Sequence, residues 1–129
     1  PESLGGSMNI TMLQSKLHRA TVTEADLDYE GSVTIDRELM DAAGLMLHQK
    51  VAIFNITNGE RIETYVIEGD YGSGTIQTNG AAAHKIRKGD LVIIVAYCQM
   101  TPEAAKAWSP KVVLLGPDNQ IKQILHPNA

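Results

Sequence analysis

Short β-prone runs, each ended by a turn signal, follow one another along this 129-residue chain. The turn signals include Asn58-Gly59, Gly72-Ser73-Gly74 and Lys88-Gly89-Asp90. Asn-Gly between apolar runs is typical of a β-hairpin, because both residues tolerate the positive φ of a tight turn. The expected strands are 10–13, 16–23, 32–35, 51–56, 61–67, 75–78, 91–97, 112–115 and 121–125. Many strands at such short spacing predict a small barrel or sandwich.

Helix signals are confined to two short segments, 36–44 and 101–107. Asp36 can cap the first helix, and Gly44 can end it after Ala43. The second opens on Thr-Pro, a capping residue followed by proline at the first helical position. We prefer a barrel to a sandwich, because closing the sheet removes exposed edges. The predicted fold class is therefore mainly β, a small barrel with short helices.

The composition narrows the organisation and location of the protein. Since no linker or repeat divides the chain, residues 8–129 are expected to form one domain. Residues 1–7 lack a signal-peptide pattern and are expected to be an expression-tag remnant. The single cysteine, Cys98, cannot form an internal disulfide, which indicates a reducing, cytoplasmic location. A net charge of −4 argues against nucleic acid as a partner, and the apolar run 91–97 is too short for a membrane span.

The dipeptide Gly31-Ser32 is either an ordinary turn or strand boundary, or a bond that cleaves itself. A serine hydroxyl can attack the preceding carbonyl, and the resulting N-to-O acyl shift makes an ester. Elimination and hydrolysis then leave a ketone. The chain would be split after Gly31, and Ser32 would become an N-terminal pyruvoyl group. That group would supply the electron sink that amine chemistry otherwise takes from a cofactor. The dipeptide alone does not decide between the two interpretations.

Cationic and phenolic side chains offer candidate ligands for a small dicarboxylate. Lys16 and His18 fall on one face of a predicted strand, as do Arg61 and Tyr65. A guanidinium suits a carboxylate, because the two form parallel hydrogen bonds. The alternatives are a solvated hairpin residue for Arg61 and a half-buried strand aromatic for Tyr65. The four histidines lack the spacing of a zinc site, so no metal site is expected.

The small residues of segment 79–83, Asn-Gly-Ala-Ala-Ala, form a further candidate element. Without bulky side chains, the backbone N–H groups there can approach a ligand carboxylate or an oxyanion. A tight turn leading into a short alanine-rich helix is the alternative interpretation.

Together these segments resemble the bacterial aspartate 1-decarboxylase family, which is pyruvoyl-dependent and makes β-alanine for pantothenate synthesis. The resemblance extends from Met8 to about Pro117. The segments that carry it are Met12-Leu13-Gln14, Lys16-Leu17-His18-Arg19, Tyr29-Glu30-Gly31-Ser32, Asp41-Ala42-Ala43-Gly44, Asn58-Gly59 with Arg61, Thr64-Tyr65, Asn79-Gly80-Ala81-Ala82-Ala83-His84 and Gly89-Asp90. It implies a double-psi β-barrel, a lyase that forms a homotetramer with active sites between subunits, and autocatalytic cleavage of a zymogen. Whether cleavage needs a maturation factor stays open.

The resemblance also implies the roles of the residues. Ser32 becomes the pyruvoyl group, which forms a Schiff base with L-aspartate, and Tyr65 donates a proton. Gly31, Ser32, Thr64 and Asn79 take part in processing. Substrate-binding roles fall to Thr64, Gly80, Ala81, Ala82, Arg61 and Lys16, and cleft-lining roles to His18 and Tyr29.

Two questions stay open at the level of sequence. Strict alternation places Thr64 and Tyr65 on opposite faces of their strand, so a bulge or a site shared between subunits must bring both to the chemistry. The rivals of a mature decarboxylase are its uncleaved precursor and a non-catalytic β-barrel ligand-binding module with an intact Gly31-Ser32 bond.

Overall fold

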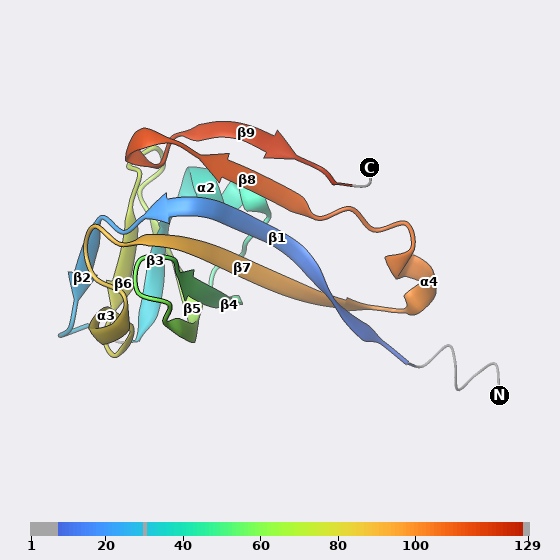
Figure 1. Ribbon diagram of the computed structural model, residues 1–129, viewed down its shortest axis with the longest axis horizontal. Coiled ribbons are helices and arrows are strands. Elements are labelled where there is room, and N and C mark those ends of the chain that lie inside the picture. The colour runs from blue at the N-terminus through green and yellow to red at the C-terminus, as the bar shows by residue number, and fades with distance from the viewer. Residues whose placement is uncertain (1–7, 30, 128–129) are drawn as a thin grey trace.

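Strands dominate the computed structural model, which describes residues 8–29 and 31–127 (Figure 1). The strands are β1 (Ile10–Thr21), β2 (Glu24–Asp26), β3 (Ser32–Asp36), β4 (Lys50–Asn55), β5 (Arg61–Gly69), β6 (Ile76–Asn79), β7 (Leu91–Met100), β8 (Lys111–Leu115) and β9 (Ile121–Leu125). The helices are α2 (Arg37–Ala43), α3 (Ala82–Lys85), α4 (Pro102–Ala105) and the 3-10 turn η1 (Pro117–Asn119). The predicted mainly β class with short helices is confirmed. The expected tag remnant, residues 1–7, lies outside the described residues.

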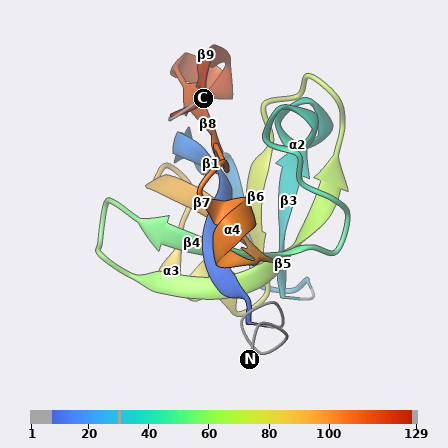
Figure 2. The same ribbon diagram turned by 90° about the vertical axis from the view of Figure 1, so that its right-hand side faces the viewer.

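One sheet carries the strands in the order β2-β6-β3-β5-β4-β7-β1-β8-β9. Only Val22 and Thr23 separate β1 from β2, although the two strands lie far apart in that order. Two backbone hydrogen bonds hold the chain where it crosses from β1 to β2. Val22 N donates to Asp90 O (2.9 Å), and Thr23 N donates to Ile76 O (2.8 Å). The chain thus crosses between distant strands of the sheet. The sheet is curved, with β3 and α2 on one side and β4 and β7 on the other (Figure 2), an arrangement compatible with the expected double-psi β-barrel although the strand order itself is not closed.

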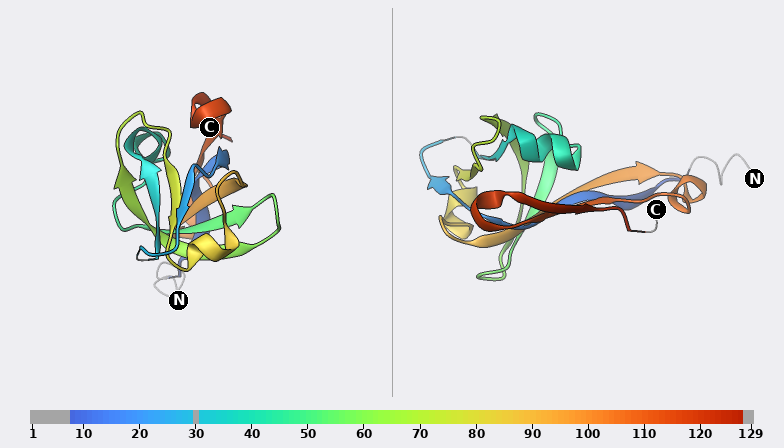
Figure 3. Two further views of the ribbon diagram at one scale, coloured as in Figure 1. Left: turned by 90° about the vertical axis from the view of Figure 1, so that its left-hand side faces the viewer. Right: turned by 90° about the horizontal axis from the view of Figure 1, so that it is seen from above.

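The two longest strands, β1 and β7, form an antiparallel pair that extends beyond the barrel to α4 (Figures 1 and 3). The sequence predicted two separate strands, 10–13 and 16–23, where the structure has β1 alone. Its register against β7 shifts between Leu13 and Ser15 and again between His18 and Ala20. Such irregularities let one strand absorb an extra residue without ending, which explains why the expected break is absent.

Apolar side chains from several strands of the sheet form the core. Leu17, Val33, Ile35, Val66 and Ile76 are fully buried. β3 lies at the centre, parallel to β5 on one side and antiparallel to β6 on the other. Because β3 is covered along nearly its whole length, its first residue is also withdrawn from solvent.

Asp36 joins the end of β3 to α2 and to the loop before β6. As predicted, it caps the helix, with its carboxylate accepting a hydrogen bond from Glu38 N at 2.8 Å. The same carboxylate accepts from Gly72 N at 2.9 Å and Gly74 N at 2.8 Å. Gly44 ends the helix in the left-handed region at φ 71°. One buried side chain therefore satisfies three backbone donors from two segments.

We expect Asp36→Ala to lower the free energy of unfolding by about 2–4 kcal/mol, because three N–H groups lose a buried acceptor. Asp41→Ala on the same helix is the matched control. Its exposed carboxylate pairs with Arg37, which is also exposed, so a change of about 0.5 kcal/mol or less is expected. Urea unfolding of both variants measures the difference. Equal losses would contradict the role of Asp36.

Candidate active site

The antiparallel register of β3 and β6 places Ser32 directly opposite Asn79. Both residues have no exposed surface. Asn79 Nδ2 donates to Ser32 Oγ at 2.9 Å and to Thr34 Oγ1 at 3.0 Å. Two residues that the sequence assigned to processing, 47 positions apart, thus meet inside the protein through a direct contact at the serine hydroxyl.

Gly80 brings the next turn against the Gly31-Ser32 segment. Its φ is +64°, and a Cβ built there would lie 2.6 Å from Tyr29 O and 2.7 Å from Gly31 N. Such distances leave no room for a side chain, so only glycine fits. Gly80 N donates to Asp26 O in β2 at 2.7 Å, which anchors the turn. At Gly31, by contrast, an added Cβ would meet no heavy atom within 4 Å.

Gly31 opens onto a cavity of about 370 Å³. The lining residues come from β5, the Gly80 turn and α3: Gly31, Ile62, Glu63, Thr64, Tyr65, Ala81, Ala82 and Lys85. The structure therefore brings five predicted site residues to one place. The short alanine-rich helix considered as the alternative for segment 79–83 is present as α3 (Ala82–Lys85).

Thr64 and Tyr65 both line this cavity without a β-bulge between them. The β4–β5 register continues without a shift from Phe54 opposite Arg61 to Lys50 opposite Tyr65. At the next residue, Val66, β5 pairs with β3 instead of β4. The cavity lies where the strand changes neighbours, so no bulge is needed for both residues to line it; the other expectation, a site shared between subunits, stays a prediction.

The ring of Tyr65 packs edge-on against His48, a contact that sequence reasoning missed. The ring centroids are 6.2 Å apart, with the planes at 63°. His48 has a φ of 72°, and its N–H donates to Val66 O at 2.8 Å. The loop between α2 and β4 thus supports one side of Tyr65. A lone histidine in that loop matches no motif, so this contact could not be predicted from the sequence.

The predicted cationic residues do not line the Gly31 cavity, although Arg61 begins β5, the strand of Thr64 and Tyr65. Lys16 and His18 are on β1, opposite Val95 and Ile93 of β7. The Arg61 guanidinium stacks over Phe54, 4.7 Å from the ring centroid. Arg61 lines a neighbouring depression that shares Ile62 and Glu63 with the Gly31 cavity. Tyr29, predicted to line the cleft, is 50% exposed.

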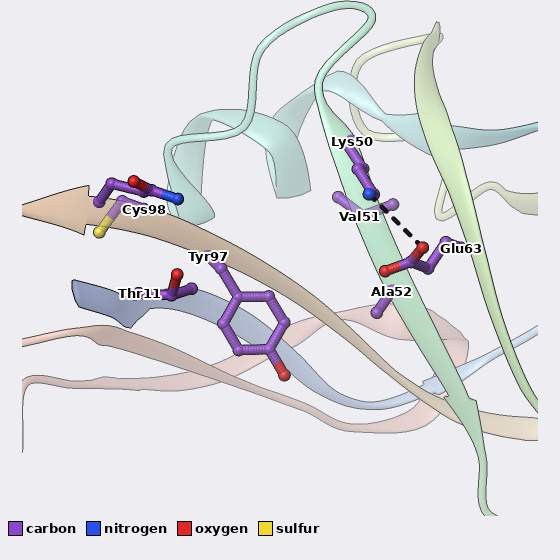
Figure 4. Close-up of a pocket in the computed structure, with 8 residues that line it drawn as sticks. Thr11, Lys50, Val51, Ala52, Glu63, Tyr97 and Cys98 are labelled. Carbon is purple, nitrogen blue, oxygen red and sulfur yellow. Dashed lines mark ion pairs between the residues drawn. The ribbon is translucent and has the colours of Figure 1, made fainter. Parts of the chain in front are cut away.

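A separate cavity of about 320 Å³ lies between β1, β4 and β7 (Figure 4). An ion pair joins Lys50 Nζ to Glu63 Oε1 at 3.4 Å, beside the ring of Tyr97. Cys98 is half-buried here. This cavity lacks a serine next to a scissile bond, so we place the candidate chemistry at Gly31 instead.

Within residues 8–29 and 31–127, no group of three or more His, Cys, Asp or Glu side chains is placed to hold a metal ion. In the same described part, none of the helices has the length and apolar character needed to cross a bilayer.

The fold and this site define a small mainly β protein in which a buried serine, Ser32, follows an exposed glycine beside a tyrosine-lined cavity. The aspartate decarboxylase family model matches residues 8–122. A relative from Syntrophus aciditrophicus, named aspartate 1-decarboxylase, is 58% identical over 89% of this chain and 99% of its own length. Relatives of the same name are 57% identical in Caulobacter vibrioides (90% and 98% covered) and 60% identical in Corynebacterium efficiens (86% and 82% covered). The chain belongs to the aspartate decarboxylase family, as the sequence resemblance predicted.

His18 has a pKa below its ordinary value of 6.5. Burial is the largest cause, and the positive charges of Lys16 and Arg19 add to it. Its Nδ1 atom is buried and has no hydrogen-bond partner among the described residues. In the folded protein, this imidazole therefore resists protonation.

This shift predicts a loss of stability in mild acid. As the pH falls through about 6.5, the unfolded chain takes up a proton at His18 before the folded chain does, so the free energy of unfolding falls. We expect the wild type to lose more stability than His18→Gln between about pH 7.5 and about pH 5.5. Lys16→Met, which removes one of the causes, should show an intermediate loss. Urea midpoints at the two pH values provide the measurement, and equal losses in all three proteins would contradict it.

Proposed function

We propose that this protein decarboxylates L-aspartate to β-alanine and CO₂ with a pyruvoyl group formed from its own Ser32. Membership of the aspartate decarboxylase family supports the reaction and the substrate. The observation that carries the proposal is the fully buried Ser32 hydroxyl, held by Asn79 at 2.9 Å beside the Gly31 cavity. Gly80, with no side chain, lets its turn approach the backbone of Tyr29 and Gly31 closely.

Cleavage needs no oxidant. Ser32 Oγ bonds to the Gly31 carbonyl carbon, the C–N bond breaks, and the hydroxyl proton passes to the freed nitrogen. Loss of the Ser32 Cα proton then breaks the Cβ–Oγ bond, whose electron pair leaves with Gly31 as a carboxylate. Water adds to the remaining imine tautomer and ammonia leaves, which makes the ketone. Thr64, which lines the same cavity, and Asn79 are the side chains proposed to assist.

The cavity residues fit a small amino acid. The pyruvoyl ketone supplies the electron sink that lets the α-carboxylate depart as CO₂. Thr64, Gly80, Ala81 and Ala82 would contact the substrate, and the Tyr65 hydroxyl would return a proton to its former α-carbon. The side-chain carboxylate must be anchored so that only the α-carboxylate leaves, which suits a cation.

Arg61 and Lys16 are the cations proposed for that anchor, and His18 and Tyr29 are proposed to line the cleft. Since Lys16 and His18 lie on β1, a second subunit is the natural way to complete the site. We therefore propose a homotetramer with sites between subunits. The exposed Leu27, Met46 and Tyr97 give apolar surface for such contacts. We also propose a cytoplasmic role in pantothenate synthesis.

Self-cleavage predicts two fragments, residues 1–31 and 32–129, in denaturing mass spectrometry. Ser32→Ala should leave one intact chain and abolish β-alanine formation, because no hydroxyl remains to attack. Ser73→Ala is the matched control, since Ser73 follows Gly72 in an exposed turn where its Oγ donates to Asp70 O at 2.6 Å. It should cleave and decarboxylate normally.

The possible results of this experiment distinguish the mature decarboxylase from its two rivals, the uncleaved precursor and the non-catalytic binding module. Decarboxylation by Ser32→Ala would end the pyruvoyl proposal. If the wild type stays intact after prolonged warming but is cleaved once cell extract is added, the protein is an uncleaved precursor that needs a maturation factor. Persistent intactness without activity would identify a binding module.

We expect Tyr65→Phe to cleave normally but to lower kcat by roughly 100-fold, because the ring is kept and only the proton donor is lost. Tyr71→Phe, at a 67% exposed tyrosine, should leave kcat unchanged. The readouts are the fraction cleaved and the β-alanine formed per cleaved chain. Slower cleavage with normal turnover per cleaved chain would show that Tyr65 acts in processing and not in catalysis.

A further inference from the structure

We infer that Gln77 is a positioning residue for the self-cleavage of Gly31-Ser32, acting through the carboxamide of Asn79; this inference rests on the proposed function. Gln77 Nε2 donates to Asn79 Oδ1 at 2.8 Å. A carboxamide has one acceptor end and one donor end. Once Oδ1 is engaged by Gln77, the NH₂ end of Asn79 must face the opposite way, toward β3.

Four polar side chains form this network on one face of the β3–β6 pair. The register sets Ser32 opposite Asn79 and Thr34 opposite Gln77, and alternate residues of a strand share a face. Asn79 uses both of its N–H groups there, one to Ser32 Oγ and one to Thr34 Oγ1. The two hydroxyls can accept or donate, so they would also tolerate a reversed carboxamide. Gln77 donates a hydrogen bond to Asn79 Oδ1 and therefore selects the orientation of the Asn79 carboxamide.

The orientation matters because of what happens to Ser32 Oγ. In the elimination step this oxygen leaves with the Gly31 carboxylate and gains negative charge. An N–H group already aimed at the oxygen stabilises that charge without reorganisation. A reversed Asn79 would instead place its carbonyl oxygen against the same atom and oppose the charge. The proposed role of Gln77 is therefore to keep the donor end of Asn79 on Oγ.

The backbone of β6 does not depend on the Gln77 side chain. The strand is paired on both sides, with β3 and with β2, through its own main chain. Gln77 itself is only half-buried. Replacing its carboxamide should therefore change the hydrogen bond to Asn79 while leaving the strand in place.

The test compares cleavage rates of freshly purified Gln77→Met, Gln77→Glu and wild type by denaturing mass spectrometry. Gln77→Met keeps the length of the side chain but removes the donor, and we expect cleavage to slow by about tenfold. Gln123→Met, on exposed β9, is the matched control and should cleave at the wild-type rate. Thermal unfolding of each protein reports whether the fold is retained.

The pH dependence of cleavage in Gln77→Glu distinguishes a positioning role from a merely structural one. Its carboxylate can only accept a hydrogen bond, so near neutral pH it turns the NH₂ of Asn79 away from Ser32. Below its ordinary pKa of about 4.3, the carboxyl can donate to Oδ1 again. We therefore expect the cleavage rate of Gln77→Glu, relative to wild type at the same pH, to rise in acid, whereas that of Gln77→Met stays low.

The possible outcomes test the role of Gln77 and the proposed function separately. Wild-type cleavage rates in both Gln77 variants would overturn the role of Gln77 and leave self-cleavage standing. Slow cleavage in both variants with an equally low melting temperature and no acid recovery would reduce Gln77 to a structural residue. Absence of cleavage in wild type would instead contradict the proposed function itself.

Discussion

The register between β3 and β6 is the constraint on which the site depends. It sets Ser32 opposite Asn79 in a fully buried pair, while β5 covers the other edge of β3. A slip of β3 by one residue would turn the side chains of Ser32 and Thr34 to the face opposite Asn79 and break both hydrogen bonds between the strands. Burial on both sides of β3 makes such a slip costly. The packing of the central strand thus fixes the chemistry at its first residue.

The surroundings of a Gly-Ser bond distinguish one that can react from one that cannot. Gly72-Ser73 has the same two residues as Gly31-Ser32, but Ser73 is exposed and its hydroxyl is engaged with Asp70 O within its own turn. Ser32 is buried, with Asn79 on its hydroxyl and Gly80 against the preceding backbone. Burial of the hydroxyl and a directed donor, both supplied by other strands, are why we propose cleavage at the first bond and not at the second.

Much of the local structure could be predicted from the sequence, because its signals act over a few residues. The Asp36 and Gly44 caps of α2, the Asn58-Gly59 hairpin and the turn before α3 are all present. β2 was missed, since an acidic segment carries little β-propensity and forms a strand only by pairing with β6. α4 ends at Ala105, two residues earlier than expected. Family membership followed from the ordered segments, and the comparisons confirmed it.

The sequence by itself determined the strand segments, the helix caps and the residues that mark the family. Only the tertiary structure decided that Thr64 and Tyr65 share one cavity without a bulge, that His48 supports Tyr65, and that Gln77 orients Asn79. The physical reason is the range of the forces involved. Caps and turns are satisfied by neighbours in the chain, whereas these contacts exist only when strand register brings distant residues together. The proposed roles of Lys16 and His18 depend in addition on a second chain.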